Sequence, residues 1–194
     1  MKNTFLKTIG TAALAILMLA AFAQISVFAH PESGSWAPPG IFAINYPNEI
    51  LAEGEGCETV ECRNEVATAR RATAGYHEIS KALADGFVAA SPCVRNPTLG
   101  TMGFHFANPA RIDQTVDPAD PEVLLYLPDD EGEMQLVAVE YVVPNTGKPF
   151  PTLFGEAFHY NLARNRYELH AWIWKNNPAG MFADFNPKLR CPGF

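Results

Sequence analysis

Four side chains able to bind a metal ion stand in the most apolar segments of this sequence. His105 lies in Met-Gly-Phe-His-Phe, His159 in Phe-His-Tyr and His170 in Leu-His-Ala-Trp, while Glu140 interrupts Leu-Val-Ala-Val-Glu-Tyr-Val-Val. A buried imidazole or carboxylate needs a hydrogen-bond partner or a metal, because burying an unpaired polar group costs about 1–3 kcal/mol. The coincidence of these polar exceptions predicts that they share one site.

Strand alternation suggests how the site is built. Glu140 is expected to share a strand face with Leu136, and the face that carries His170 is expected to point into the same interior. His105, Glu140 and His170 then form a set of two histidines and one carboxylate. Such a set suits one divalent ion of Zn, Fe, Mn or Cu, with positions open for water or substrate. His159 is expected as a fourth ligand or as a group behind the ligands.

A structural role for the same residues stays open. A strand histidine can be bonded to a backbone carbonyl, and Glu140 can form a salt bridge with Arg164 or Arg166. His77 is expected on an exposed helix face, outside the site.

Other reaction chemistries have weaker signals. Cleavage after Ala29 would leave His30 as the first residue, which could bind copper through its amino group and ring, whereas cleavage after Ala23 would remove that site. The sequence has no Gly-rich phosphate loop, nucleophile elbow, HExxH helix or EF-hand loop, so hydrolases that depend on them are disfavoured. Whether the protein is an enzyme is not decided by the sequence.

Residues 1–29 have the pattern of an export signal. Lys2 and Lys7 give a positive start, residues 9–22 are mostly apolar, and Ala29 is the small residue that a signal peptidase needs. We therefore expect a secreted or cell-envelope protein without a stable membrane anchor after cleavage. The formal net charge of the whole chain is −7, which makes nucleic acid an unlikely partner because phosphate binding depends on Lys and Arg.

The four cysteines fit the same compartment. An even number in an exported chain indicates two disulfides, for which three pairings are possible. We favour Cys57 with Cys62, closing a short Glu-rich loop, and Cys93 with Cys191, which would attach the C-terminus to the end of the helical region. A thiolate zinc site is the alternative, but the spacing of the cysteines fits it poorly.

The remaining pattern predicts an α+β domain. Residues 30–62 are rich in Pro and Gly and form an expected N-terminal arm, and residues 63–85 have helical periodicity. Residues 122–127 and 134–143 predict a β-hairpin, with further strands at 103–106 and 167–174 and an irregular ending at 176–194. We expect a single domain of residues 63–194, with an N-terminal helix packed on an antiparallel β-sheet or small β-barrel.

Several segments resemble a group of exported bacterial proteins without an assigned activity. These are MGFHF, PEVLLY, LVAVEY, YELHAWIW and NNPAGMFADFNP. The resemblance covers residues 64–191 and implies an exported single domain, without supplying catalytic residues. Cupins are the nearest comparison for a small barrel with His and Glu ligands, but their HxH pair followed closely by Glu is absent here.

These patterns predict an exported, disulfide-stabilised domain that binds one divalent metal ion in an apolar cavity. A small apolar ligand or substrate is an expected partner of that cavity. The alternative is a ligand-binding or structural protein of the cell envelope that holds no metal.

Overall fold

The computed structural model describes residues 56–193, which all belong to one compact unit of residues 45–194. The predicted signal, His30 and most of the predicted arm lie outside the described residues. None of the helices in the described part is both long and apolar enough to cross a membrane.

The helical region consists of three pieces. Helix α1 (Val60–Thr73) begins at the N-cap Thr59, whose hydroxyl accepts the backbone N–H of Cys62 at 3.1 Å. A 3-10 turn, η1 (Ala74–His77), and the short helix α2 (Ile79–Ala84) follow. The expectation of one helix over 63–85 was wrong at this break. Gly75 favours the interruption, and the hydroxyl of Tyr126 donates to the carbonyl of Tyr76 at 2.7 Å, which a continuous helix would have used internally.

All strand pairs are antiparallel. The main sheet has the order β1-β3-β4-β5-β9-β8, with β2 also pairing with β3, and β6 and β7 form a separate pair. The strands are β1 (Val88–Ala89), β2 (Val94–Asn96), β3 (Gly100–Ala107), β4 (Val123–Pro128), β5 (Met134–Pro144), β6 (Thr152–Leu153), β7 (Glu156–Ala157), β8 (His159–Asn161) and β9 (Arg166–Ala171).

The predicted α+β architecture is confirmed, with an open sheet in the described residues rather than a closed barrel. The predicted hairpin corresponds to β4 and β5, and the predicted strand 103–106 lies within β3, nearer its C-terminal end. Strand β9 ends earlier than predicted, at Ala171. The chain leaves the sheet there because the backbone N–H of Trp172 donates to the carbonyl of Met181 at 2.9 Å. In addition, Nε of Arg70 donates to the carbonyl of Ile173.

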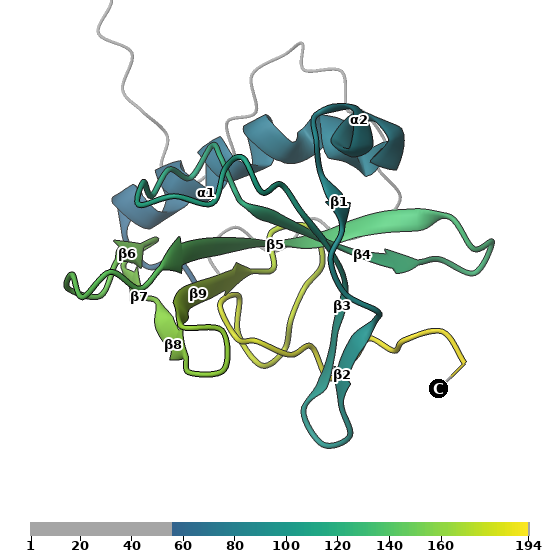
Figure 1. The fold of residues 1–194 in the computed structure, drawn as a ribbon. Coiled ribbons are helices and arrows are strands. Elements are labelled where there is room, and N and C mark those ends of the chain that lie inside the picture. Colours follow the sequence, from purple (N-terminus) through teal and green to yellow (C-terminus); the bar gives the residue numbers. More distant parts are fainter. Residues whose placement is uncertain (1–55, 194) are drawn as a thin grey trace, which may run out of the picture. The chain divides into compact units, whose positions relative to one another are not determined.

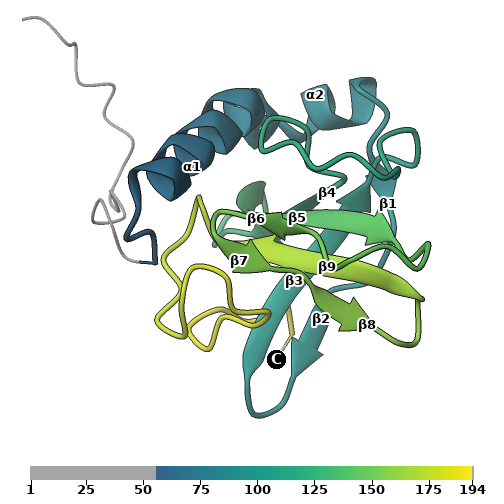
Figure 2. The same cartoon turned by 90° about the vertical axis from the view of Figure 1, so that its left-hand side faces the viewer.

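The helices cover one face of the sheet, and the C-terminal segment crosses the other (Figures 1 and 2). On the helix side, Val66 and Ala69 of α1 belong to the same apolar cluster as Leu124 and Tyr126 of β4. A second cluster on the opposite face contains alternate residues of β4 together with Trp172. The central strands are therefore buried on both faces, which explains their nearly continuous apolar sequence.

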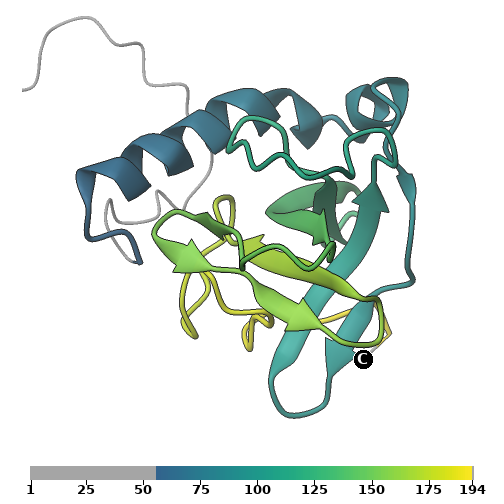
Figure 3. The same cartoon turned by 60° about the vertical axis from the view of Figure 1, so that its left-hand side comes forward.

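We call residues 172–193 the C-terminal strap. Its first residues contact α1, because Arg70 donates to the carbonyl of Ile173 and Trp174 donates to the hydroxyl of Thr73. Figure 3 shows other parts of this yellow segment passing beneath the sheet. Thr101 and Asn186 exchange backbone hydrogen bonds of 3.0 and 2.9 Å, which attach the strap to β3. Its lack of regular helix or strand agrees with the predicted irregular ending.

Both favoured disulfides are present. Cys57 pairs with Cys62, and Cys93 pairs with Cys191 across 98 residues of sequence. The first closes the loop before α1, and the second attaches the end of the strap to the connection between β1 and β2. Two disulfides point to an oxidising, extracytoplasmic environment.

Candidate metal centre

Three of the predicted ligands come from three different strands of the sheet. His105 lies on β3, Glu140 on β5 and His170 on β9. Glu140 is the direct cross-strand neighbour of His170, whereas β4 runs between Glu140 and His105. All three side chains are on the sheet face away from the helices, where they converge above the apolar side chains of β4.

A β-bulge sets which residues of β5 face the site. Leu125 pairs with Ala138 and the next residue of β4 pairs with Leu136, so Val137 is an extra residue in β5. The bulge reverses the alternation on its N-terminal side. Leu136 therefore belongs to the helix-side cluster, and Ala138 to the cluster on the site's face. The prediction that Leu136 shares a face with Glu140 was wrong for this reason.

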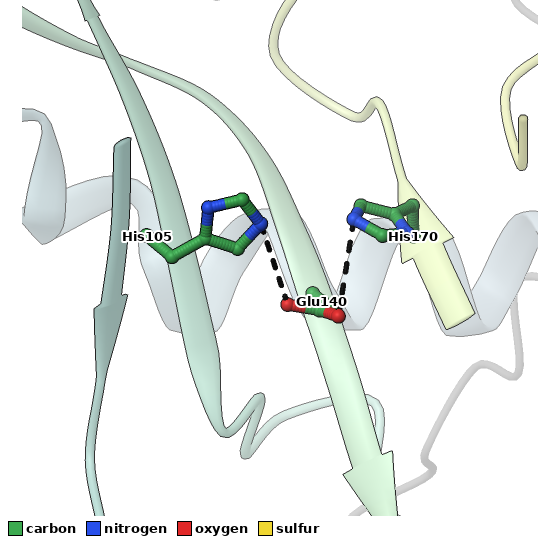
Figure 4. Close-up of side chains that lie close together, drawn as sticks. All are labelled: His105, Glu140 and His170. Atoms are coloured by element: carbon green, nitrogen blue, oxygen red, sulfur yellow. Dashed lines mark ion pairs between the residues drawn. The ribbon is translucent and has the colours of Figure 1, made fainter. Parts of the chain in front are cut away.

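The carboxylate of Glu140 lies between the two imidazole rings (Figure 4). Its Oε2 is 3.8 Å from His105 Nε2, and its Oε1 is 3.9 Å from His170 Nε2. One ligand atom from each of the three residues lies within 4.8 Å of the others, so the group could hold a metal ion. The residues are 8%, 2% and 1% exposed for His105, Glu140 and His170 respectively.

Three polar atoms in this group are buried without a hydrogen-bond partner. They are Glu140 Oε2 and both ring nitrogens of His170. Burial raises the pKa of Glu140. Burial lowers the pKa of His105 to about 4, with a further contribution from the nearby charge of His170. For His170, burial acts downward, but the carboxylates of Glu140 and Asp184 outweigh it and the pKa is raised.

Ser91 orients the ring of His105. Its Oγ lies 2.9 Å from His105 Nδ1 and also donates to the carbonyl of Pro92 at 2.8 Å. When the one hydroxyl proton is used on Pro92, Nδ1 of His105 must be the donor to Ser91. The lone pair of His105 is then on Nε2, the nitrogen that faces Glu140, which is the tautomer that a metal ligand requires.

Asp184 plays the corresponding part for His170. Asp184 Oδ1, on the strap, lies 3.4 Å from His170 Nδ1, an ion-pair distance whose alignment is too poor for a hydrogen bond. His170 is the leading reason why the pKa of Asp184 is lowered. With the carboxylate of Asp184 next to Nδ1, the Nε2 atom of His170 faces Glu140. Many metal-bound histidines have a carboxylate next to the ring nitrogen that does not bind the metal.

His159 lies outside the group of three. Its side chain is 43% exposed, with Nδ1 3.5 Å from Asp184 Oδ1 and Nε2 3.7 Å from Glu168 Oε2. The rings of His159 and His170 are parallel, with centroids 6.3 Å apart. Contact with Asp184 links His159 to the group only indirectly, so of its two predicted roles this position fits the one behind the ligands.

Arg166 and His77 have partners outside the group of three. Arg166 forms an ion pair with Glu168, and the ion pairs of Glu140 are with the two histidines. His77, in η1, is half-buried rather than exposed, because its ring packs edge-on against Trp174 with a centroid distance of 4.4 Å. Burial, followed by the charge of Lys175, lowers its pKa.

Sequence reasoning missed Ser91 and Asp184. Asp184 stands in Phe-Ala-Asp-Phe, the same kind of polar exception that identified Glu140, and this signal could have found it. Ser91 precedes Pro92 in an ordinary turn sequence and carries no comparable signal. Both residues lie on irregular segments, whereas the three candidate ligands lie on strands.

Two cavities of about 250 and 240 Å³ lie elsewhere on this unit. The first is lined by Trp172 and strap residues around Asn177, and the second by Arg95, Arg190 and Cys191 among others. Neither is lined by the three candidate ligands.

No protein-family model matches this chain, and the searches of curated proteins and of solved structures gave no significant match.

Proposed function

We propose that the protein is an exported metal-binding protein that holds one divalent transition-metal ion through His105, Glu140 and His170. The observation that carries the proposal is the convergence of the three side chains around buried atoms that lack hydrogen-bond partners. A cation between them would satisfy Glu140 and His170 together, and so would remove a cost of about 1–3 kcal/mol per unpaired group.

The surroundings of the two rings support this proposal. Ser91 and Asp184 stand behind the Nδ1 atoms, so both Nε2 atoms face the carboxylate. Two imidazoles and one carboxylate suit Zn, Fe(II), Mn or Cu, with Zn and Fe(II) best matched to this donor set. Such an ion would supply Lewis-acid chemistry toward an oxygen of a small substrate, or would activate water.

Structural stabilisation without metal is the second candidate. The raised pKa of His170, with carboxylates at 3.4 and 3.9 Å, favours an imidazolium between Asp184 and Glu140. In that case His170 supplies the charge that a metal would otherwise bring. The small apolar ligand that the sequence suggested as a partner stays a prediction under either candidate.

Metal content and metal titration separate the two candidates. The wild-type protein, freed of metal with a chelator and titrated with Co²⁺, should bind one equivalent and develop visible absorption. His105→Ala and Glu140→Gln should each abolish this absorption, and His77→Ala, on the helix side, should leave it unchanged. Asp184→Asn should weaken the affinity by about 10–100-fold without abolishing binding.

Zn²⁺ should compete with Co²⁺ for the same equivalent. His159→Ala should retain the stoichiometry, because its ring lies outside the group of three. A folded wild-type protein that binds neither ion, whether as purified or after refolding with excess metal, would rule out the metal proposal and favour the structural candidate.

A further inference from the structure

The candidate metal centre is closed by two irregular segments. Ser91, in the connection between β1 and β2, contacts His105, and Asp184, in the C-terminal strap, contacts His170. Strand β4 and its apolar neighbours form the floor of the site. Both segments therefore lie next to the buried ligand atoms, and half-exposed His159 of β8 stands beside His170 on a third side.

The strap is attached at a few defined points. Trp172 donates from its backbone to Met181 and from its indole Nε1 to the carbonyl of Ala183. Asn186 is fully buried and exchanges backbone hydrogen bonds with Thr101. Leu189 packs against the apolar cluster on the site's face of the sheet. Asp184 lies between these attachments, so its backbone can move away from His170 only when the strap lifts.

One disulfide connects both closing segments. Cys93 is two residues beyond Ser91, and Cys191 is seven residues beyond Asp184. Cys191 lines the cavity of about 240 Å³ between the β2–β3 turn and the strap. Among the described residues, its lining includes Arg190, whose guanidinium donates to the carbonyls of Pro187 and Leu189.

We propose that the strap and the Cys93–Cys191 disulfide form a redox-controlled closure of the metal centre. The inference rests on the proposed metal-binding function. A small dithiol would donate two electrons and two protons, giving two cysteine thiols and its own disulfide. With that link broken, the strap and the Ser91 connection move independently and the metal exchanges. A small-molecule disulfide would take the two electrons and two protons back, giving two small thiols and restoring the Cys93–Cys191 link.

Two pairs of variants test the closure. Cys93→Ser/Cys191→Ser stands for the reduced protein, and Cys57→Ser/Cys62→Ser is its matched control on the other disulfide. Gly100→Ala loosens the strap with the disulfide intact, because its Cβ would lie 2.2 Å from the carbonyl oxygen of Asn186. Gly132→Ala is its control: φ is likewise positive (+88°), but no atom lies within 4 Å of the new Cβ.

Two measurements are made on each protein. The first is the half-time of Co²⁺ loss to excess EDTA. The second is the rate at which diethyl pyrocarbonate modifies each histidine of the metal-free protein, followed by mass spectrometry, with the half-exposed His159 as the internal standard. Wild-type protein reduced with dithiothreitol and then desalted is labelled in parallel.

Co²⁺ loss should be at least about tenfold faster than in wild type for both Cys93→Ser/Cys191→Ser and Gly100→Ala. A tenfold change corresponds to a shift of about 1.4 kcal/mol in the equilibrium between the closed and the open strap. Labelling of His105 and His170 should rise in the same proteins and after reduction, and the two controls should behave as wild type. Equal Co²⁺ loss in all proteins, or labelling of His105 and His170 at the rate of His159 in oxidised wild type, would overturn the inference.

Failure of the metal proposal gives a different result. If no protein binds Co²⁺, that proposal fails, and the labelling rates alone decide whether the strap controls access to the histidines. If Cys93→Ser/Cys191→Ser does not fold by circular dichroism, the comparison of Gly100→Ala with Gly132→Ala decides whether the strap closes the centre, and labelling of reduced against oxidised wild type decides whether the disulfide controls it.

Discussion

Replacing Glu140 by Gln should cost the metal-free protein nothing and should abolish metal binding. The carboxylate is 2% exposed, and its Oε2 has no hydrogen-bond partner. Gln has nearly the same volume but no charge, and its amide can donate to an imidazole Nε2. We expect the free energy of unfolding of the metal-free variant to equal that of wild type or to exceed it by up to about 3 kcal/mol.

The order of stability should reverse when metal is added. A ligand that binds only the folded state stabilises it by about 2.7 kcal/mol at a free concentration one hundred times its Kd. Wild type should gain this amount with Zn²⁺, whereas Glu140→Gln should gain little. Urea denaturation followed by tryptophan fluorescence, with EDTA and then with Zn²⁺, measures both differences. Thermal midpoints should follow them, at about 2–4 °C per kcal/mol.

Glu168→Gln provides the matched control on β9. Burial opposes ionisation of Glu168, but interactions with His159, Asn161 and Arg166 outweigh it and lower the pKa to about 2. Because the folded pKa is depressed, the charged form stabilises the fold near neutral pH, so this variant should be less stable than wild type with or without metal.

A loss of more than about 1 kcal/mol in metal-free Glu140→Gln would refute this reasoning. It would mean that Glu140 is already satisfied, with His170 as a charged partner. The site would then be a structural ion pair, and Zn²⁺ should not reverse the order of the two proteins.

Glu122, buried beside β5, should make the fold less stable as the pH rises. Burial raises its pKa to about 8, so between about pH 4.5 and 8 the folded state retains a proton that the unfolded state releases. The free energy of unfolding of Glu122→Gln should therefore rise relative to that of wild type, by up to about 1.4 kcal/mol per pH unit across this window. Parallel pH profiles of the urea midpoint for the two proteins would contradict this. The two disulfides should differ in their contributions, because Cys93–Cys191 closes 98 residues and Cys57–Cys62 only 5. Loop entropy predicts losses of about 4.7 and about 2 kcal/mol for the paired Ser variants, and equal urea midpoints would show that this model does not apply.

Local patterns in the sequence were sufficient for the sheet but not for its details. The β4–β5 hairpin was predictable because apolar strands flank a polar turn, and Asp129 caps that turn by accepting from Glu131 and Glu133. The bulge at Val137 was not predictable, because an extra apolar residue in an apolar strand leaves the composition unchanged. The helix break depends on a tertiary hydrogen bond from Tyr126, which no local pattern contains.

The candidate ligands were predictable for a different physical reason. A polar side chain in a strand that is buried on both faces is costly, so His105, Glu140 and His170 stood out without any compact motif. Their spacing carried no information, because strand order, rather than sequence distance, brings β3, β5 and β9 together. Asp184 lies in an irregular segment, where local rules do not predict the position of a side chain.

The strap and the polar residues beneath it are best explained together. A sheet covered by helices on one face can leave its other face in water, with polar residues at alternate positions. Here the second face is covered by the strap, and the apolar alternation of β4 continues beneath it. That cover removes water from His105, Glu140 and His170, which raises the cost of leaving them unpaired and strengthens every electrostatic interaction among them. If stability alone had shaped this face, apolar residues of similar volume would serve it better at those three positions. The cover and the polar group are consistent with each other when an ion is held between them, which is why strap attachment and metal retention should change together.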